Sequence, residues 1–206
     1  MAAVIYADDI CLLAPCRSAL QILLSACERY GLEWGLSYNP SKSKVMTFGK
    51  CQSIAPLTMY GSNLQFVDEL KYLGVTLVSG KFFTTTIRPL LRKFRCASNT
   101  ILNAHHRSSE PVLMKLIYAV AVPLITYACD STPICSRQLN DMTIALNDVI
   151  RRIFSYQRWE SVTFLRQTLG YLSVTEIVRQ RTCMFMKQIA CTNNDTLITL
   201  SSIPAL

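Results

Sequence analysis

The sequence has 206 residues, enough for one domain or two small ones, and half of them are hydrophobic, which favours a folded protein over a disordered one. Its longest apolar stretch, residues 116–129, is interrupted by Pro123 and is shorter than the roughly 20 residues that span a bilayer, so we expect no membrane association. Asp8 and Asp9 fall where the apolar part of a signal peptide would lie, which predicts an intracellular protein in the nucleus or the cytoplasm.

The net charge of the chain is +8, and most of the excess positive charge lies in residues 51–100 and 151–206. Clustered positive charge favours a polyanionic partner such as nucleic acid, although an ordinary basic protein remains an alternative. The nine cysteines form no Cys-x-x-Cys pair and the two histidines are adjacent, which argues against a zinc site. Several cysteines lie in apolar runs, and we interpret them as reduced core thiols: Cys11, Cys27 and Cys183.

The first motif is Tyr6-Ala7-Asp8-Asp9, which stands between the apolar segments 2–5 and 10–14. The apolar segments predict two short buried strands, and Ala7-Asp8-Asp9 predicts a tight turn between them. Two adjacent carboxylates repel each other, so they are costly to hold together unless a cation neutralises them. Mg²⁺, which binds one or two carboxylates together with substrate phosphates, would do so. A solvated surface turn is the alternative.

The next segment predicts a helix that begins at Ser18-x-x-Gln21, a capping-box pattern. Gly31 and Gly35 are expected to end this helix. One face is apolar at helical spacing, and we expect it to lie across a sheet. That face consists of Leu20, Leu23, Leu24, Cys27 and Tyr30.

Residues 36–77 predict a series of short strands. Asn39-Pro40 breaks the chain before a strand at residues 45–48, and Lys42 and Lys44 precede that strand. Residues 57–60 and 64–67 predict a hairpin around Gly61-Ser62-Asn63. Residues 70–77, which contain Tyr72-Leu73-Gly74, predict a strand with a glycine where another group approaches closely.

Three motifs within residues 4–77 resemble, in this order, those of reverse transcriptases of non-LTR (LINE-type) retrotransposons. They are Tyr6-Ala7-Asp8-Asp9, Asn39-Pro40-Ser41-Lys42-Ser43 and Tyr72-Leu73-Gly74. The resemblance implies that Asp8 and Asp9 bind the catalytic metal. It implies that Lys42, three residues after Asn39 and followed by a serine, approaches the phosphates of the incoming nucleotide and could protonate the leaving pyrophosphate. It also implies that Tyr72, Leu73 and Gly74 form the primer grip.

The remainder of the chain predicts helices, at residues 87–102, from Ser109-Glu110-Pro111 onward, at 138–154 and at 172–190. The helix at 138–154 has apolar residues at helical spacing, which predict a buried stripe, and the segment 172–177 predicts a capping box at the start of the last helix. Arg88, Arg92 and Arg95 recur at helical spacing and form one basic face. The all-helical basic pattern is similar to the thumb that follows the palm in this family. Candidates for contacts with template–primer phosphates are Arg92, Arg95, Arg151, Arg152 and Arg158, with solvated helix faces as the alternative.

The expected fold is therefore α+β. Residues 1–80 would form part of a polymerase palm, made of antiparallel hairpins with a packed helix, and residues 81–206 would form an all-helical thumb. The resemblance implies an RNA-directed DNA polymerase, a nucleotidyltransferase that uses Mg²⁺, an RNA template, a DNA primer and dNTP substrates in the intact parent enzyme.

Only seven residues precede Asp8, so the upstream catalytic aspartate and the fingers are expected to be missing. This predicts an incomplete magnesium site and a fragment that is inactive without the N-terminal half of the polymerase. Two alternatives are a noncatalytic nucleic-acid-binding remnant and a translated relic without function. The template preference, an upstream endonuclease and the oligomeric state remain open.

Overall fold

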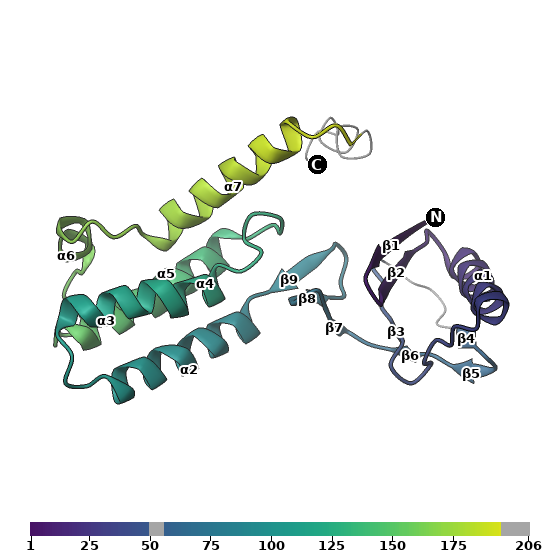
Figure 1. Ribbon diagram of the computed structural model, residues 1–206, viewed down its shortest axis with the longest axis horizontal. Coiled ribbons are helices and arrows are strands. Elements are labelled where there is room, and N and C mark those ends of the chain that lie inside the picture. The colour runs from purple at the N-terminus through teal and green to yellow at the C-terminus, as the bar shows by residue number, and fades with distance from the viewer. Residues whose placement is uncertain (50–55, 195–206) are drawn as a thin grey trace. The chain divides into compact units, whose positions relative to one another are not determined.

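The computed structural model describes residues 1–49 and 56–194 and has an α+β fold (Figure 1). The chain divides into two compact units, Met1–Thr84 and Thr85–Leu206. Each unit has its own hydrophobic core. In the part of the chain that the structure describes, no helix combines the length and the apolar character needed to cross a membrane.

The first unit contains one helix and several short strands. Strand β1 pairs with β2, β3 with β6 and β4 with β5, and the order β7-β8-β9 makes a three-stranded sheet whose last strand crosses the boundary between the units. The elements are β1 (Ala2–Tyr6), β2 (Asp9–Leu13), α1 (Arg17–Trp34), β3 (Lys44–Val45), β4 (Thr58–Met59), β5 (Ser62–Asn63), β6 (Gln65–Phe66), β7 (Glu69–Tyr72), β8 (Val75–Val78) and β9 (Thr84–Thr86).

Strands β1 and β2 form the expected antiparallel hairpin, but the expectation that they are buried is wrong. Every residue of β1 is exposed, including Ile5 at 66%. An apolar segment is buried only if another element covers it, and none of the described residues covers β1.

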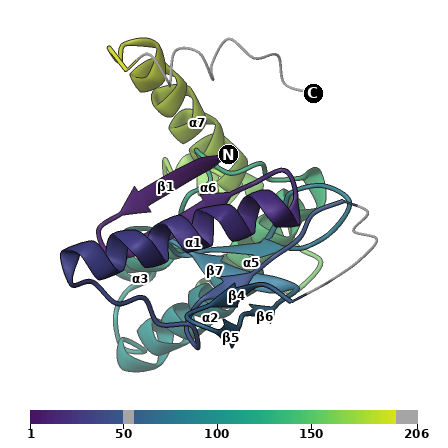
Figure 2. The ribbon, with the colours of Figure 1, turned by 90° about the vertical axis from the view of Figure 1, so that its right-hand side faces the viewer.

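Helix α1 lies beside the hairpin and contributes Leu24 to the core of the first unit (Figure 2). The helix ends at Gly35, whose φ of 66° is the left-handed cap conformation. The expectation that Gly31 ends the helix is wrong. Gly31 is buried inside the last turn, where a Cβ would lie 2.6 Å from the main-chain oxygen of Leu36. Its missing side chain therefore provides space rather than a helix end.

The β4–β5 and β7–β8 hairpins of this unit differ from the expected ones. In β4–β5 the turn is Tyr60-Gly61, one residue earlier than expected, and β6 pairs in parallel with β3 rather than with residues 57–60. Residues 70–77 form the β7–β8 hairpin, not one strand, with Leu73-Gly74 as its turn. All four turn residues have positive φ, as a type I′ turn requires.

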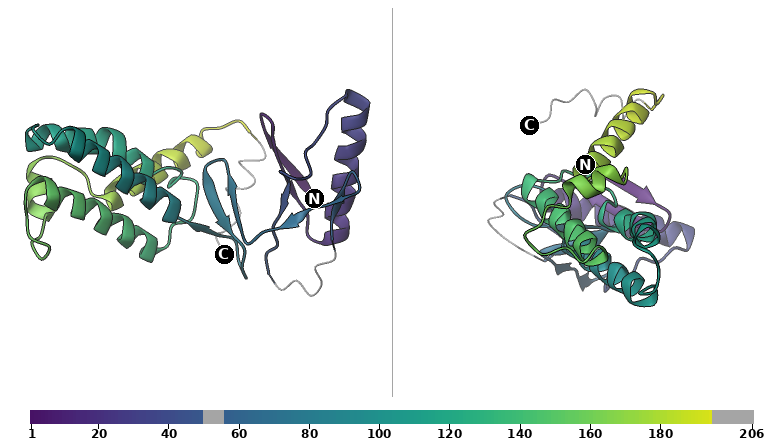
Figure 3. Two further views of the ribbon diagram at one scale, coloured as in Figure 1. Left: turned by 90° about the horizontal axis from the view of Figure 1, so that it is seen from below. Right: turned by 90° about the vertical axis from the view of Figure 1, so that its left-hand side faces the viewer.

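The second unit is helical (Figure 3). Helix α3 continues through the π-helical segment η1 into α4, and Pro123, which has no N–H group, lies in the first turn of α4. The elements are α2 (Arg88–Ala104), α3 (Glu110–Leu116), η1 (Ile117–Ala121), α4 (Val122–Ile125), α5 (Ser136–Ile153), α6 (Thr163–Thr168) and α7 (Val174–Ala190).

Apolar residues at helical spacing build the core of this unit. The expected stripe of α5 is confirmed, because Met142, Leu146 and Ile150 are almost completely buried against Phe94 of α2 and Met114 of α3. The expected capping box of α7 is also present. Ser173 Oγ accepts from the main-chain N–H of Glu176 at 3.1 Å, and the Glu176 carboxylate accepts from the main-chain N–H of Ser173 at 2.6 Å.

Candidate active site and nucleic-acid interface

The tip of the β1–β2 hairpin presents the two carboxylates. Tyr6 pairs with Asp9, so the turn consists of Ala7 and Asp8, and Asp9 is the first residue of β2. Ala7 takes a positive φ of 51°, which closes the two-residue turn. Both Asp8 and Asp9 are exposed. The adjacent carboxylates therefore face solvent, where a cation and substrate phosphates could reach them.

The two carboxylates at this tip are enough ligands for one metal ion but too few for two. Mg²⁺ is commonly held by one or two carboxylates together with substrate phosphates, and Asp8 and Asp9 could supply the carboxylates. A pair of ions about 4 Å apart needs further ligands. Across residues 1–49 and 56–194, no group of three or more His, Cys, Asp or Glu side chains could hold a metal.

Lys42 lies in a turn that Asn39 organises. The Asn39 Oδ1 atom accepts from the main-chain N–H of Ser41 at 3.0 Å, and the Asn39 main-chain oxygen accepts from the N–H groups of Lys42 and Ser43 at 3.2 and 3.1 Å. The Lys42 side chain is exposed. Within the described residues, no hydrogen bond or ion pair joins Lys42 to Asp8 or Asp9.

The neighbouring Lys44 differs from Lys42. Its ammonium group donates to the main-chain oxygen of Ser41 at 3.2 Å and to the side-chain oxygen of Gln65. Lys44 therefore ties the turn to β6. Lys42, which extends from the same turn, is the lysine whose charge is available to a phosphate.

Tyr72-Leu73-Gly74 occupies the β7–β8 turn. The Tyr72 hydroxyl is shielded from solvent and, within the described residues, has no hydrogen-bond partner. Burial raises the pKa of Tyr72, and the Cys11 thiol and the Asp9 carboxylate raise it further. The fold thus brings the phenol of the third motif into the electrostatic neighbourhood of the first, although more than sixty residues separate them in sequence.

Helix α2 carries the expected basic face. Arg88, Arg92 and Arg95 are exposed, whereas Phe94, Ser98 and Ile101 are buried on the side that packs against the other helices. The two faces are distinct because the charged and the apolar residues recur at different helical offsets. The guanidinium groups of Arg92 and Arg95 can therefore reach phosphates without disturbing the core.

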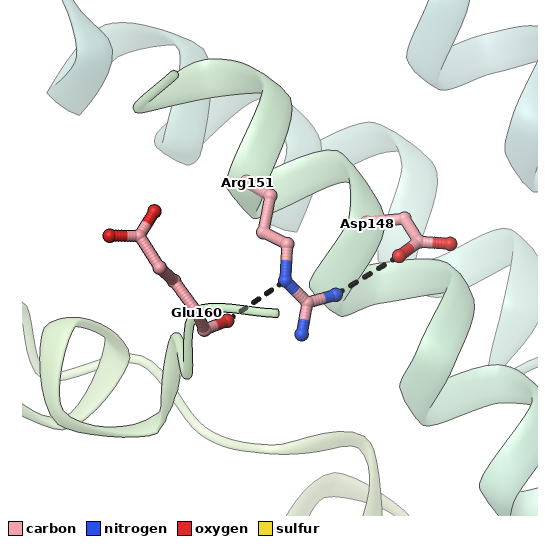
Figure 4. A network of polar contacts seen from close by, with 3 residues as sticks. All are labelled: Asp148, Arg151 and Glu160. Carbon is pink, nitrogen blue, oxygen red and sulfur yellow. Dashed lines mark hydrogen bonds and ion pairs between the residues drawn. The ribbon is translucent and has the colours of Figure 1, made fainter. Parts of the chain in front are cut away.

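Two further candidate arginines already have partners. Arg151 donates from Nε to the main-chain oxygen of Glu160 and from Nη1 to Oδ1 of Asp148, both at 3.0 Å (Figure 4). Arg152 donates from Nη1 to Oδ1 of Asn99 at 2.7 Å. These contacts fix the chain around α5, so Arg151 in particular has a structural role.

Trp159 is a residue to which the sequence patterns assigned no role. It lies in the loop between α5 and α6, and its side chain is 82% exposed. A tryptophan inside the polar stretch Gln157-Arg158-Trp159-Glu160 was the available signal, because tryptophan is usually largely buried.

Comparison with known proteins identifies the family of this chain. Residues 1–77 match the family model described as reverse transcriptase (RNA-dependent DNA polymerase). This region contains the Asp8-Asp9 hairpin, the Lys42 turn and the Tyr72-Leu73-Gly74 turn. Together with a relative that is 30% identical over 72% of this chain, the match shows that the chain belongs to the reverse transcriptases.

That relative, to which the chain is similar, is the RNA-directed DNA polymerase from mobile element jockey of Drosophila funebris, a non-LTR retrotransposon protein. The chain is 30% identical to it over 159 residues, which amounts to 72% of this chain and 17% of the relative. The chain therefore spans a small part of that protein. No solved structure gives a significant match.

Proposed function

We propose that residues 1–80 are the C-terminal part of a reverse-transcriptase palm and that residues 81–206 are the thumb. Three observations support this. The family match covers residues 1–77, the three motifs occur in the order of the family, and the helical unit follows the mixed one. In the parent enzyme the two parts would act on an RNA template, a DNA primer and dNTP substrates.

Each motif has a proposed role. Asp8 and Asp9 would hold Mg²⁺, which in the intact polymerase supplies two-metal nucleotidyl transfer. Lys42 would neutralise the phosphates of the incoming nucleotide. Tyr72, Leu73 and Gly74 would position the primer end. The presence of all three motifs in the region that matches the family supports these roles.

The chain by itself would bind template–primer and would not extend it. The observation that carries this conclusion is the donor set at the hairpin tip, where two carboxylates stand without a third metal-binding group among the described residues. Two carboxylates from one hairpin tip can hold a cation weakly but cannot fix two ions in the geometry of phosphoryl transfer.

A second candidate is a noncatalytic nucleic-acid-binding module. The exposed Arg88, Arg92 and Arg95 on one face of α2 favour it. Phosphate contacts of this kind give affinity without chemistry and without sequence preference. For this candidate the Asp8-Asp9 turn would be a remnant.

A salt titration of duplex binding tests the shared part of both candidates. Replacement of Arg92 and Arg95 by Gln should weaken binding of an RNA–DNA duplex and reduce the slope of log K against log salt by roughly 0.9 for each phosphate that is no longer neutralised. Lys115→Gln, an exposed charge on α3, is the matched control. Unchanged affinity and slope in the double variant would remove α2 from the interface.

Comparing Asp8→Ala with the parent chain in Mg²⁺ separates the two candidates. If the hairpin binds Mg²⁺ together with nucleotide phosphates, the variant should lose the Mg²⁺-dependent part of dNTP binding. For a noncatalytic module, Asp8→Ala should change neither dNTP binding nor duplex binding.

A further inference from the structure

The loop between α5 and α6, residues 155–161, is held in one conformation by hydrogen bonds. The main-chain N–H of Tyr156 donates to the Arg151 oxygen at 2.9 Å, and that of Glu160 donates to the Gln157 oxygen at 3.0 Å. The Glu160 carboxylate accepts from the Gln157 N–H at 2.5 Å. Arg151 Nε donates to the Glu160 oxygen at 3.0 Å (Figure 4). These hydrogen bonds give the loop a defined backbone conformation.

This ordered loop and the first turn of α6, which follows it, each present one large aromatic side chain to solvent. Trp159 is 82% exposed and Phe164, in the first turn of α6, is 80% exposed, whereas Val162 between them is 1% exposed and belongs to the core. The buried valine anchors the segment, so the exposure of the two rings is a property of a fixed backbone. Leaving two such rings in water, within six residues, forgoes the large favourable free energy of burying their apolar surface, and exposed aromatic surface of this kind marks an interaction site.

The charges around Trp159 select the kind of partner. Arg158 precedes it and is exposed, and the Glu160 carboxylate is occupied by the Gln157 N–H. Residues 151–206 as a whole carry excess positive charge. A ring beside an exposed guanidinium suits a ligand with flat aromatic groups and negative charge. Unpaired nucleotides have both, because their bases can stack and their phosphates can pair with arginine.

We propose that the α5–α6 loop, together with the first turn of α6, is a binding site for single-stranded nucleic acid, in which unpaired bases stack on Trp159 and on Phe164 and Arg158 contacts a phosphate. The site requires unpaired bases, since the faces of paired bases are covered by their neighbours in the duplex. The basic face of α2 has no such requirement, because its arginines would contact phosphates, which a duplex also exposes. The inference rests on the proposed function to the extent that the chain contacts nucleic acid.

The chain contains two tryptophans, Trp34 and Trp159, which allows a direct optical test. Trp34→Phe keeps a ring beside Tyr30, the aromatic neighbour of Trp34 at 6.0 Å, and leaves Trp159 as the sole indole. Titration of this variant of the full chain with an unstructured oligouridylate should quench the indole fluorescence. An equal concentration of a blunt RNA–DNA duplex should quench it far less.

Substitutions at position 159 separate stacking from simple apolar contact. Trp159→Leu should weaken oligouridylate binding by roughly 5- to 150-fold, the decrease expected for one base–aromatic stack, with little change in the salt slope. Trp159→Phe should recover part of the affinity, because it restores an aromatic face. Arg158→Gln should instead reduce the salt slope by roughly 0.7. Circular dichroism should show that all three variants remain folded, since both side chains are exposed.

Different results overturn different proposals. Oligouridylate binding with no quenching in Trp34→Phe and unchanged affinity in Trp159→Leu would overturn the loop site while leaving nucleic-acid binding intact, and would favour a protein partner for Trp159. An absence of binding to both single strand and duplex at low salt would overturn the proposed function together with the inference.

Discussion

The side chain of Gln21 in α1 makes two hydrogen bonds with the backbone of Thr58 in β4. Its Nε2 atom donates to the Thr58 oxygen at 2.9 Å, and its Oε1 atom accepts from the Thr58 N–H at 3.0 Å. An amide side chain thus pairs with β4 as a neighbouring strand would. The sequence suggested that Gln21 completes a capping box, but the structure uses it to join the helix to the strand.

Removing this pair should destabilise the first unit. Gln21→Ala leaves two partly buried backbone groups of Thr58 unpaired, and we expect a decrease of about 1–3 kcal/mol in the free energy of unfolding. Urea denaturation measures it. Arg29→Ala, at an exposed position of the same helix, serves as the control and should change stability by less than about 0.5 kcal/mol. Equal effects of the two substitutions would contradict the assigned role of Gln21.

The sign of the effect of Gly31→Ala is diagnostic. In an open helix interior, alanine stabilises by about 1 kcal/mol relative to glycine. Here the new Cβ would lie 2.6 Å from the Leu36 main-chain oxygen, so we expect a net destabilisation of about 1–3 kcal/mol. Gly35→Asn, at the cap with open space, should be nearly neutral. A melting temperature of Gly31→Ala higher than that of the parent chain would contradict this, because it would show that the backbone near Leu36 shifts to make room for the Cβ.

Tyr118 should make the helical unit sensitive to alkaline pH. Its hydroxyl donates to the Leu172 oxygen at 2.8 Å, and its ring lies 4.4 Å from that of Tyr171. Burial raises the pKa of Tyr118 to about 12, opposed by Arg166 and assisted by Tyr171 and Glu176. The neutral phenol is therefore favoured in the folded state. Its contribution is fully present below pH 10 and is lost as the pH rises through 12.

The corresponding measurement is urea unfolding of the parent chain and of Tyr118→Phe below pH 10 and near pH 12. The phenylalanine variant should be about 1 kcal/mol less stable below pH 10, where it lacks the hydrogen bond. Between these pH values the parent chain should lose about 1–2 kcal/mol more stability than the variant, because only the parent chain has the Tyr118 phenol to ionise. Parallel pH profiles of the two proteins would refute the burial of the phenol.

The cysteines should differ widely in reactivity. A hydrogen bond with Ser18 and main-chain N–H groups at the start of α1 lower the pKa of the exposed Cys16 thiol, whereas burial raises the pKa of Cys129 to about 11. Alkylation near neutral pH should modify Cys16 first. Cys129 should react at least about 100-fold more slowly than an unburied thiol until the helical unit unfolds, as followed by peptide mass mapping. Early modification of Cys129 in the native state would argue against its position in the core.

Hydrophobic periodicity and caps predicted the long helices well, because α5 and α7 carry their own stripe and capping box. The short strands were harder. Tyr60-Gly61 and Leu73-Gly74 are type I′ turns whose first residue is large and apolar, so the usual Asn-Gly signal was absent. The pairing of β3 with β6 depends on contacts between distant segments, which local patterns do not contain.

Burial was the least predictable property. Ile5 and Cys183 stand in apolar surroundings in the sequence, yet both are exposed, while Gly31 is buried. Whether an apolar residue is covered depends on which elements pack against it. For the same reason the sequence alone could indicate Asp9 and Tyr72 as separate motif residues, but not their electrostatic proximity.

Primer extension tests the central claim most directly. The parent chain and Asp8→Ala would each be incubated with an RNA template, a DNA primer, dNTPs and Mg²⁺, with duplex binding measured in parallel. We expect no extension by either protein and salt-sensitive binding by both, because Asp8 and Asp9 lack a third metal-binding partner in the described chain. Extension by the parent chain that disappears in Asp8→Ala would show that the metal site is complete and would contradict the account.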